Sequence, residues 1–207
     1  MRRFTGELSR DDPLARPSFE LIVVGTSMGG LNALSILLAG LPKSFLVPVA
    51  VVQHRHKDSD NTLSSFLQRH STLPLKAVED KETIMPGWIY LAPADYHLLV
   101  EQGSFALSTE APVSYARPSI DVLFESAADV YAERVIGVIL TGANHDGAQG
   151  LAKIQERGGL AIIQDPATAE SRTMPEAAIA AVKPDWILPL SGIAPCLVNL
   201  CQFALKE

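Results

Sequence analysis

The sequence has little cysteine, and its two cysteines carry no recognisable chemistry. Cys196 and Cys201 lie close together in an apolar C-terminal segment of the 207-residue chain, without a histidine or a spacing that suits a metal site. We therefore expect both thiols to be small buried side chains of a last helix. Scarce cysteine also agrees with a cytoplasmic protein.

The chain also lacks an excess of positive charge. Its 17 basic and 23 acidic side chains give a net charge of −6, and lysine and arginine form no long cluster. Such a composition offers no general attraction for nucleic acid or for an anionic membrane surface. A role in binding nucleic acid is therefore not expected.

Long hydrophobic runs are absent as well. The longest dense apolar run, 45–52, is interrupted by Pro48. It is far shorter than the roughly 18 residues that a membrane helix needs. Residues 1–7 begin with basic side chains, but no apolar stretch follows them, so no secretory signal is visible. These absences predict a cytoplasmic protein without membrane insertion.

The sequence does contain enough apolar material for a core, since 47% of its residues are hydrophobic and only 19% are charged. Residues 1–18 are polar and show no apolar period, which predicts a flexible arm before a domain that spans 19–207. Nearly continuous apolar runs in that domain predict buried strands at 19–24, 48–53, 75–78, 135–140, 160–164 and 186–188.

Segments with helical spacing of apolar residues alternate with these strands. They predict helices at 31–39 closed by Gly40, around 63–67, at 120–131 with Ser119 as N-cap, around 151–154, around Pro175, and at 193–205. Three short β-rich segments, 88–91, 96–100 and 105–107, predict an antiparallel hairpin insertion. The expected fold class is α/β, a doubly wound, mostly parallel sheet with helices on both faces and an antiparallel hairpin insertion.

The most informative stretch is the turn Gly25-Thr26-Ser27-Met28-Gly29-Gly30 between a predicted strand and a predicted helix. Glycines permit a sharp turn, and the helix N-terminus offers unpaired N–H groups. A serine held there can attack a carbonyl while neighbouring amides hold the oxyanion. Two other interpretations stay open at this point: the turn binds a phosphate group, or Ser27 caps the helix.

A nucleophilic serine needs a base and a carboxylate that orients the base. His54 directly follows the second strand, and Asp146 follows the strand at 135–140. Because the carboxyl ends of parallel strands meet at one edge, we expect Ser27, His54 and Asp146 in the same crevice. His56 is a weaker base candidate, and Asp146 taken alone also fits a helix N-cap. The order Ser, His, Asp differs from that of α/β-hydrolases.

Several short blocks of sequence, spread over about 20–182, match the pattern of a known protein family and occur in the same order as in that family. They are Gly25-Thr26-Ser27-Met28-Gly29-Gly30, Gln53-His54, Tyr90-Leu91-Ala92-Pro93 with Asp95 and His97, Arg117-Pro118-Ser119-Ile120-Asp121-Val122-Leu123-Phe124, Gly137-Val138-Ile139-Leu140-Thr141-Gly142 with Asp146-Gly147-Ala148, and Met174-Pro175-Glu176-Ala177-Ala178. Each block alone is weak, but the ordered set is specific. The chain resembles the catalytic domain of chemotaxis protein-glutamate methylesterases, the CheB family.

The resemblance implies a serine esterase, a hydrolase that removes methyl groups from γ-glutamyl methyl esters. Its substrate would be a methylated chemoreceptor or a similar methyl-accepting protein, on which many members also deamidate glutamines. The family's nucleophile falls on Ser27, its base on His54 and its orienting carboxylate on Asp146. These are the residues that the strand-end argument selects. No metal and no organic cofactor is implied.

The chain departs from the family pattern around this site. Met28 stands where many members have threonine, so only the backbone N–H of Met28, with the region of Ala143, is expected to hold the oxyanion. Ala143-Asn144-His145 replaces the frequent Met-Gly-Asn and brings His145 beside the site. His56 replaces a frequent proline, and with His145 it is expected to form the substrate rim.

Regulation is expected to differ too. Many relatives carry an N-terminal receiver domain, whereas only the arm 1–18 precedes the first strand here. We expect either an esterase that is always open or a separate regulatory protein that covers the site. The alternatives are a nucleotide- or phosphate-binding module, although the turn lacks the lysine of a P-loop, a scaffold without hydrolase activity, and a hydrolase of small esters.

Overall fold

The computed structural model describes residues 19–56 and 62–202. Within these ranges, seven strands form one parallel sheet and two further strands form an antiparallel hairpin. The predicted arm, 1–18, lies outside the described residues, as do the end of the last predicted helix and part of the loop after His56.

The strands and helices fall close to the predicted positions. The strands are β1 (Leu21–Thr26), β2 (Val49–Gln53), β3 (Leu75–Ala77), β4 (Ile89–Leu91), β5 (His97–Glu101), β6 (Ser104–Ser108), β7 (Val135–Ile139), β8 (Leu160–Gln164) and β9 (Trp186–Leu188). The helices are α1 (Gly30–Ala39), α2 (Thr62–Gln68), α3 (Ile120–Tyr131), α4 (Ala148–Glu156), α5 (Thr173–Ala181) and α6 (Leu190–Gln202).

The large sheet has the order β3-β4-β2-β1-β7-β8-β9. The chain builds outward from β1 to one side as far as β3 and β4, and later returns to the other side with β7, β8 and β9. β1 therefore lies at the point where the winding direction reverses. In open parallel sheets, ligands bind at the carboxyl edge beside such a point.

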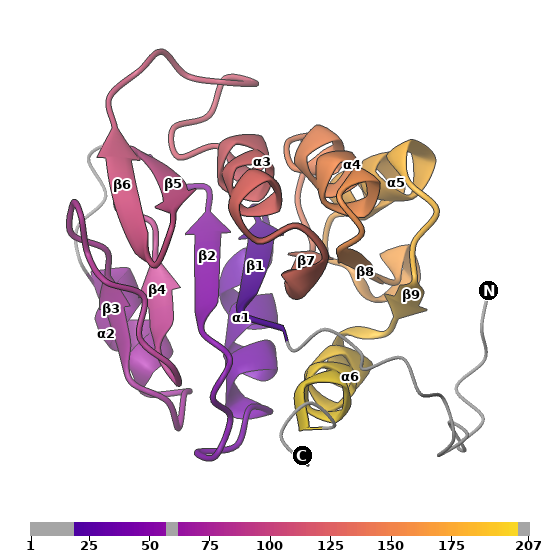
Figure 1. Cartoon of the computed structure of the whole chain (residues 1–207). Coiled ribbons are helices and arrows are strands. Elements are labelled where there is room, and N and C mark those ends of the chain that lie inside the picture. The colour runs from indigo at the N-terminus through magenta and orange to yellow at the C-terminus, as the bar shows by residue number, and fades with distance from the viewer. Residues whose placement is uncertain (1–18, 57–61, 203–207) are drawn as a thin grey trace.

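The sheet is buried on both faces, which explains its continuous apolar strands. Leu21 and Val23 of β1 pack in an apolar cluster with α3, α4, α5 and the β5–β6 hairpin, whereas Ile22 and Val24 pack in a second cluster with α1, α2 and α6. Figure 1 shows the two helical layers on opposite sides of the sheet. The predicted α/β fold with helices on both faces is confirmed.

The prediction that 88–91 belongs to the antiparallel insertion is wrong. β4 lies in the large sheet between β2 and β3 and pairs with both in parallel. Its residues Ile89, Tyr90 and Leu91 are all buried, as expected of an inner strand covered on both faces. The hairpin itself is confirmed for β5 and β6, which pair in antiparallel register.

β1 also extends beyond its predicted end, through Gly25 to Thr26. Gly25 does not break the strand; it makes room for α3, since a Cβ at Gly25 would lie 2.3 Å from Cγ2 of Ile120. A glycine within a strand often marks such a close approach. The N-terminus of α3 therefore lies against the edge at which Ser27 follows the strand.

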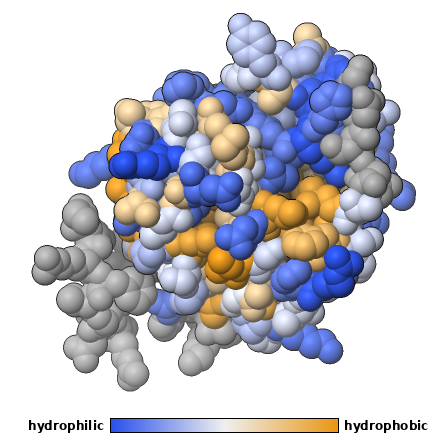
Figure 2. Space-filling model, turned by 180° about the vertical axis from the view of Figure 1, so that it is seen from behind, coloured by the Kyte–Doolittle hydropathy of each residue, from blue (hydrophilic) through white to orange (hydrophobic). Residues whose placement is uncertain are grey.

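Apolar side chains also reach the surface. Figure 2, a view from behind, shows apolar patches separated by polar side chains on that face. The exposed large apolar side chains include Leu31 and Ile36 of α1 and Leu46 after it. Exposed apolar groups are normal in folded proteins. In the two described ranges, no helix has the length and apolar character needed to cross a membrane.

Candidate active site

Three neighbouring strands bring the predicted site residues to one edge of the sheet. Ser27 directly follows β1, His54 directly follows β2, and Asp146 lies in the loop between β7 and α4. β1 lies between β2 and β7, and both neighbours run parallel to it. The three residues therefore emerge at the carboxyl ends of adjacent strands.

Backbone hydrogen bonds continue the strand pairing into these loops. The N–H of His54 donates to the carbonyl of Thr26 at 3.1 Å. The N–H of Ser27 donates to the carbonyl of Thr141, just after β7, at 3.0 Å. Ser27 is therefore held between the ends of β2 and β7, one residue after Thr26, which pairs with Gln53.

The turn after β1 has a backbone that its glycines permit. Gly29 has a φ of +76°, in the left-handed region, and is the N-cap residue of α1 without a side-chain cap. Ser27 is half-buried, and its Oγ makes no hydrogen bond to another described residue. The interpretation that Ser27 caps the helix is therefore not supported, and its hydroxyl is not committed to the fold.

Gln53, which received no role from the sequence, reinforces this junction. Its Nε2 donates to the carbonyl oxygens of Ser27 and of His54, each at 2.9 Å. Its Oε1 lies against Gly30, where an added Cβ would be only 2.0 Å away. Gln53 thus fixes the turn of Ser27 relative to the backbone of His54. Its place beside His54, in a block that resembles the family pattern, is the sequence signal for this role.

His54 and Asp146 are in direct contact. Nε2 of His54 lies 2.7 Å from Oδ2 of Asp146, and the two side chains are 12% and 0% exposed. The predicted base and the predicted orienting carboxylate, which are 92 residues apart in the chain, therefore meet. The imidazole keeps an exposed edge, while the carboxylate is sealed from solvent.

Each oxygen of the Asp146 carboxylate accepts two hydrogen bonds. Oδ2 accepts from His54 and from the N–H of Ile120, both at 2.7 Å. Oδ1 accepts from Oγ of Ser119 at 2.9 Å and from the N–H of Asp121 at 3.0 Å. Burial alone raises the pKa of Asp146, but the hydrogen bonds outweigh burial and hold the pKa below its ordinary value. Asp146 is therefore ionised and fixed in place.

Asp146 caps α3 and not the helix that follows it. The N–H groups of Ile120 and Asp121, the first two residues of α3, donate to its carboxylate, while the N-cap residue of α4 is Gly147. Ser119 holds the N-cap position of α3 as predicted, but its hydroxyl donates to Asp146 instead of accepting from its own helix. The capping oxygen therefore comes from a distant segment.

Asp121 of α3 caps α4 in return. Its Oδ1 accepts from the N–H of Gly147 at 2.9 Å and of Gly150 at 2.8 Å. Burial raises the pKa of Asp121 to about 6; those N–H groups oppose the rise, and the nearby Asp146 adds to it. The helices approach closely, since a Cβ at Gly150 would lie 2.5 Å from Cβ of Phe124. Asp146 and Asp121 thus each cap the other's helix, and this ties the loop between β7 and α4 to α3.

His97 supports this network from the hairpin. It is buried at the start of β5, its Nδ1 accepts from the N–H of Ser119 at 3.2 Å, and its Nε2 donates to the carbonyl of Ala111 at 3.1 Å. Hydrogen bonds therefore run from the hairpin through Ser119 to Asp146. His97 received no role from the sequence, although it belongs to one of the quoted blocks.

The second ring nitrogen of His54 is also occupied. Nδ2 of Asn144 donates to Nδ1 of His54 at 3.0 Å, and Oδ1 of Asn144 accepts from the N–H of Asp146 at 3.2 Å. Asn144 appeared in the sequence only as a departure from the family pattern, without a role. In the structure it is a direct neighbour of the predicted base.

The remaining predicted residues lie around this centre. The backbone N–H groups of Met28 and Ala143, expected to hold an oxyanion, donate no hydrogen bond to any described residue. The carbonyl of Met28 accepts from Oγ1 of Thr141 at 2.9 Å, which holds this part of the turn. His56 and His145 are exposed, and no hydrogen bond joins His145 to His54 in the described ranges.

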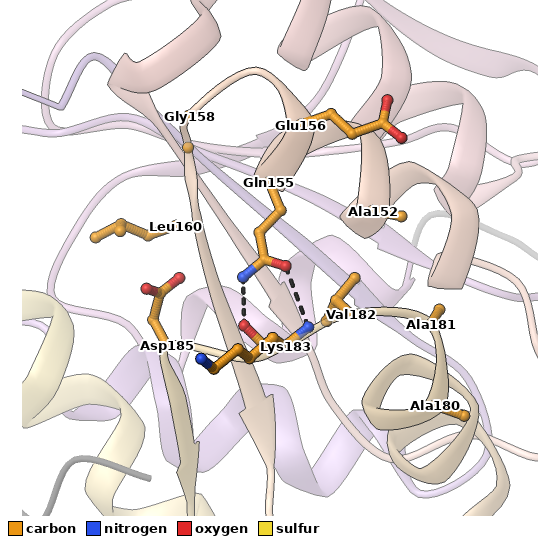
Figure 3. A pocket seen from close by; sticks show the side chains of 11 residues that line it. Ala152, Gln155, Glu156, Gly158, Leu160, Ala180, Ala181, Val182, Lys183 and Asp185 are labelled. Carbon is orange, nitrogen blue, oxygen red and sulfur yellow. Dashed lines mark hydrogen bonds between the residues drawn. The ribbon is translucent and has the colours of Figure 1, made fainter.

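A hollow of about 710 Å³ lies at the opposite edge of the sheet, by the amino ends of β8 and β9. Its lining includes Gly159 and Leu160 at the start of β8 and Asp185 just before β9. Figure 3 shows Gln155 of α4 bonded to the backbone of Lys183, whose N–H donates to Oε1 of Gln155 at 3.2 Å and whose carbonyl accepts from Nε2. The hollow contains none of the predicted site residues.

No metal site is formed by the part of the chain that the structure describes, where no cluster of three or more His, Cys, Asp or Glu side chains is arranged to hold an ion.

Comparisons with known proteins agree on one family. The family model described as CheB methylesterase matches residues 22–197. A Leptospira interrogans protein, provisionally named protein-glutamate methylesterase/protein-glutamine glutaminase, is 47% identical over 92% of this chain and 99% of its own length. A Pseudomonas savastanoi relative, named protein-glutamate methylesterase/protein-glutamine glutaminase 3, is 40% identical over 92% of this chain and 56% of its own length. The chain therefore spans nearly all of one relative and just over half of the other.

A solved structure is similar over most of the fold. It is the crystal structure of the Thermotoga maritima CheB methylesterase catalytic domain, which matches with a TM-score of 0.84 and 35% sequence identity. The similarity covers 88% of this chain and 99% of that domain. The parallel sheet, its two helical layers and the hairpin are therefore an arrangement that this chain shares with that domain.

Proposed function

The chain belongs to the CheB methylesterase family, and we propose that it is a serine esterase that hydrolyses γ-glutamyl methyl esters on a chemoreceptor-type protein. Ser27 is the nucleophile, His54 the base and Asp146 the orienting carboxylate. We extend the proposal to deamidation of glutamine, since relatives bear the name protein-glutamine glutaminase. The proposed location is the cytoplasm.

The observation that carries the proposal is the contact between His54 and Asp146 beside the turn of Ser27. The ionised carboxylate accepts from Nε2 of His54 at 2.7 Å, which leaves Nδ1 as the ring atom that takes a proton. Ser27 and His54 follow adjacent parallel strands at equivalent positions. A nucleophile, a base and an orienting group thus come from three neighbouring strand ends.

In the first step, Oγ of Ser27 attacks the ester carbonyl carbon, and its proton passes to Nδ1 of His54. The carbonyl oxygen becomes an oxyanion, which the backbone N–H groups of Met28 and Ala143 stabilise, since they donate to no described residue. The protonated His54 then gives its proton to the methoxy oxygen. The C–O bond breaks, methanol leaves, and an acyl ester of Ser27 remains.

In the second step, water attacks the acyl ester and gives a proton to His54. The new oxyanion collapses, the bond to Oγ of Ser27 breaks, and His54 returns the proton to Oγ. The product is the free glutamate side chain. With a glutamine substrate the first leaving group is ammonia. Asp146 stabilises the imidazolium in both steps without taking a proton itself.

The rim of the site would meet the substrate protein. The side chain of Met28 and those of His56 and His145 are exposed around the strand ends. We expect them to contact the receptor segment that carries the ester. A separate regulatory protein that covered the same edge would block access to Ser27.

Replacement of the nucleophile tests the proposal directly. We expect Ser27→Ala to lower the rate of methanol release from methylated receptor by a factor on the order of 10³–10⁴ or more, because no other group would attack the carbonyl. Ser35→Ala is the matched control, since within the described residues Oγ of Ser35 bonds only to the carbonyl of Leu31 in its own helix. Methanol release at the wild-type rate by Ser27→Ala would exclude Ser27 as the nucleophile.

A further inference from the structure

We propose that Asn144 blocks the base, His54, in the resting enzyme. Its side-chain amide occupies Nδ1 of His54, the ring nitrogen that must accept the proton of Ser27, and it has to move aside when a substrate binds. The inference rests on the proposed function, since it concerns how the same serine and histidine become active.

The orientation of the Asn144 amide follows from its two partners. Its oxygen accepts from the N–H of Asp146 at 3.2 Å, so its nitrogen faces Nδ1 of His54 at 3.0 Å. An amide nitrogen can only donate, and Nδ1 must therefore be the accepting nitrogen of the ring. The ring proton then lies on Nε2, which agrees with the bond from Nε2 to Asp146. Asn144 and Asp146 thus select the same tautomer.

This tautomer is the one that catalysis needs, but its lone pair is taken. A neutral imidazole has one lone pair in the ring plane, and here that lone pair points to Asn144. Oγ of Ser27 must donate to the same lone pair and makes no hydrogen bond to any described residue. Once His54 is protonated, Nδ1 becomes a donor and would face the NH₂ group of Asn144, a second donor. Asn144 therefore opposes both the start and the product of the proton transfer.

Asn144 is the partner of His54 that can move. Asp146 is buried and held by four hydrogen bonds, whereas Asn144 is half-buried in the loop before α4, between the exposed residues Ala143 and His145. Among the described residues, the one additional bond of the Asn144 side chain is to the N–H of Asp146. Under the proposal, the receptor segment that carries the ester displaces the Asn144 side chain as it binds at Ser27.

We call this block of Nδ1 of His54 by the Asn144 amide the Asn144 gate. Two substitutions of Asn144 distinguish the gate from a structural role of Asn144 in the loop. In Asn144→Ser, the hydroxyl can still accept from the N–H of Asp146 but is too short to reach His54. Asn144→Ala removes both bonds. Asn32→Ser is the matched control, because Asn32 is exposed on α1.

The first readout is the rate at which an organophosphonate labels Ser27, followed by mass. We expect labelling about 3- to 10-fold faster in Asn144→Ser and Asn144→Ala, because one hydrogen bond no longer has to break before Ser27 is activated. The kcat/KM for methylated receptor should rise by a similar factor, because the cost of breaking this hydrogen bond also lies between the free enzyme and the transition state. The ¹⁵N resonance of Nδ1 of His54 should move downfield, as expected for a nitrogen that loses its donor, and should stay unchanged in Asn32→Ser.

Labelling that is slower than wild type, or unchanged, in both Asn144 variants would overturn the gate. Asn144→Ser decides the matter if the alanine variant does not fold. Ser27→Ala and His54→Ala distinguish this failure from failure of the proposed function. If the labelling rate depended on Ser27 and His54 but was the same with and without the Asn144 substitutions, the gate alone would be rejected. Labelling of Ser27→Ala at the wild-type rate would reject the proposed nucleophile, and the gate with it.

Discussion

At the scale of a single residue, Asp146 shows how one carboxylate serves both structure and chemistry. Its four donors are the imidazole of His54, the hydroxyl of Ser119 and the backbone N–H groups of Ile120 and Asp121. Three of these donors belong to the start of α3, so the helix holds the carboxylate in its ionised form. The imidazole is consequently oriented by a group that has no freedom to rotate.

Replacement of this carboxylate by an amide tests that account. In Asp146→Asn, one oxygen becomes an NH₂ group, so two of the four donors face another donor whichever way the amide turns. We expect turnover in the methanol-release assay to fall about 10³–10⁴-fold. We also expect the free energy of unfolding to fall by about 1.5–3 kcal/mol. Asp129→Asn, an exposed position on the same helix, is the control. Wild-type turnover by Asp146→Asn would contradict the assignment.

At the scale of elements, α3 and α4 are joined by an exchange of capping carboxylates. Asp146, before α4, accepts from the first N–H groups of α3, and Asp121, within α3, accepts from the N–H groups of Gly147 and Gly150. Each helix therefore satisfies unpaired N–H groups of the other. Because Asp146 belongs to the proposed site, packing of these two helices determines where the base is held.

The exchange predicts a pH dependence of stability at Asp121. The pKa of Asp121 is about 6 in the folded protein, above its ordinary value of 3.8, so its contribution to stability is fully present below pH 4. That contribution is lost as the pH rises through 6. Asp121→Asn keeps an oxygen for Gly147 and Gly150 but cannot ionise. We therefore expect the free energy of unfolding of this variant, relative to wild type, to increase between pH 4 and pH 7.

Urea unfolding of both proteins at the two pH values measures this difference. Asp129→Asn should show no comparable change, because Asp129 is an exposed residue of α3 with Arg157 as a partner. A relative stability of Asp121→Asn that stays constant, or that falls with rising pH, would show that Asp121 does not carry the buried charge that we describe.

At the scale of the whole molecule, two apolar clusters on opposite faces of one sheet hold the site edge in place. Phe124 of α3 is fully buried in one cluster. The same cluster contains Ile120, which lies against Gly25 at the end of β1. Phe66 of α2 is only partly buried, at the margin of the other cluster. The two phenylalanines therefore have the same chemistry and different surroundings.

These surroundings predict different costs for the same truncation. Phe124→Ala should lower the free energy of unfolding by about 3–5 kcal/mol, since it leaves a cavity between α3, α4 and the sheet. Phe66→Ala should cost less than half as much, because solvent and neighbouring side chains can fill the space at the margin. Urea unfolding compares the two variants, and equal costs would contradict the burial difference.

Much of the fold was predictable because buried parallel strands have a distinct apolar pattern. The strands at 160–164 and 186–188 were predicted with their observed bounds, and the hairpin of β5 and β6 was recognised. The segment that forms β4 was misassigned, since a run of three apolar residues does not reveal which strand it pairs with. The extension of β1 through Gly25 was missed because the contact with Ile120 is not local.

The order of residues along the chain is enough to place the chemistry-bearing residues at the carboxyl edge, because each follows a buried strand and parallel strands end together. Ser27, His54 and Asp146 were selected on that ground, and their catalytic roles stay predictions. The hydrogen-bond partners of these side chains follow from the folded arrangement alone. The amide of Asn144 on Nδ1 of His54 and the carboxylate of Asp146 on the start of α3 join residues far apart in the chain, and hydrogen bonds depend on distance in space, which no spacing in sequence specifies.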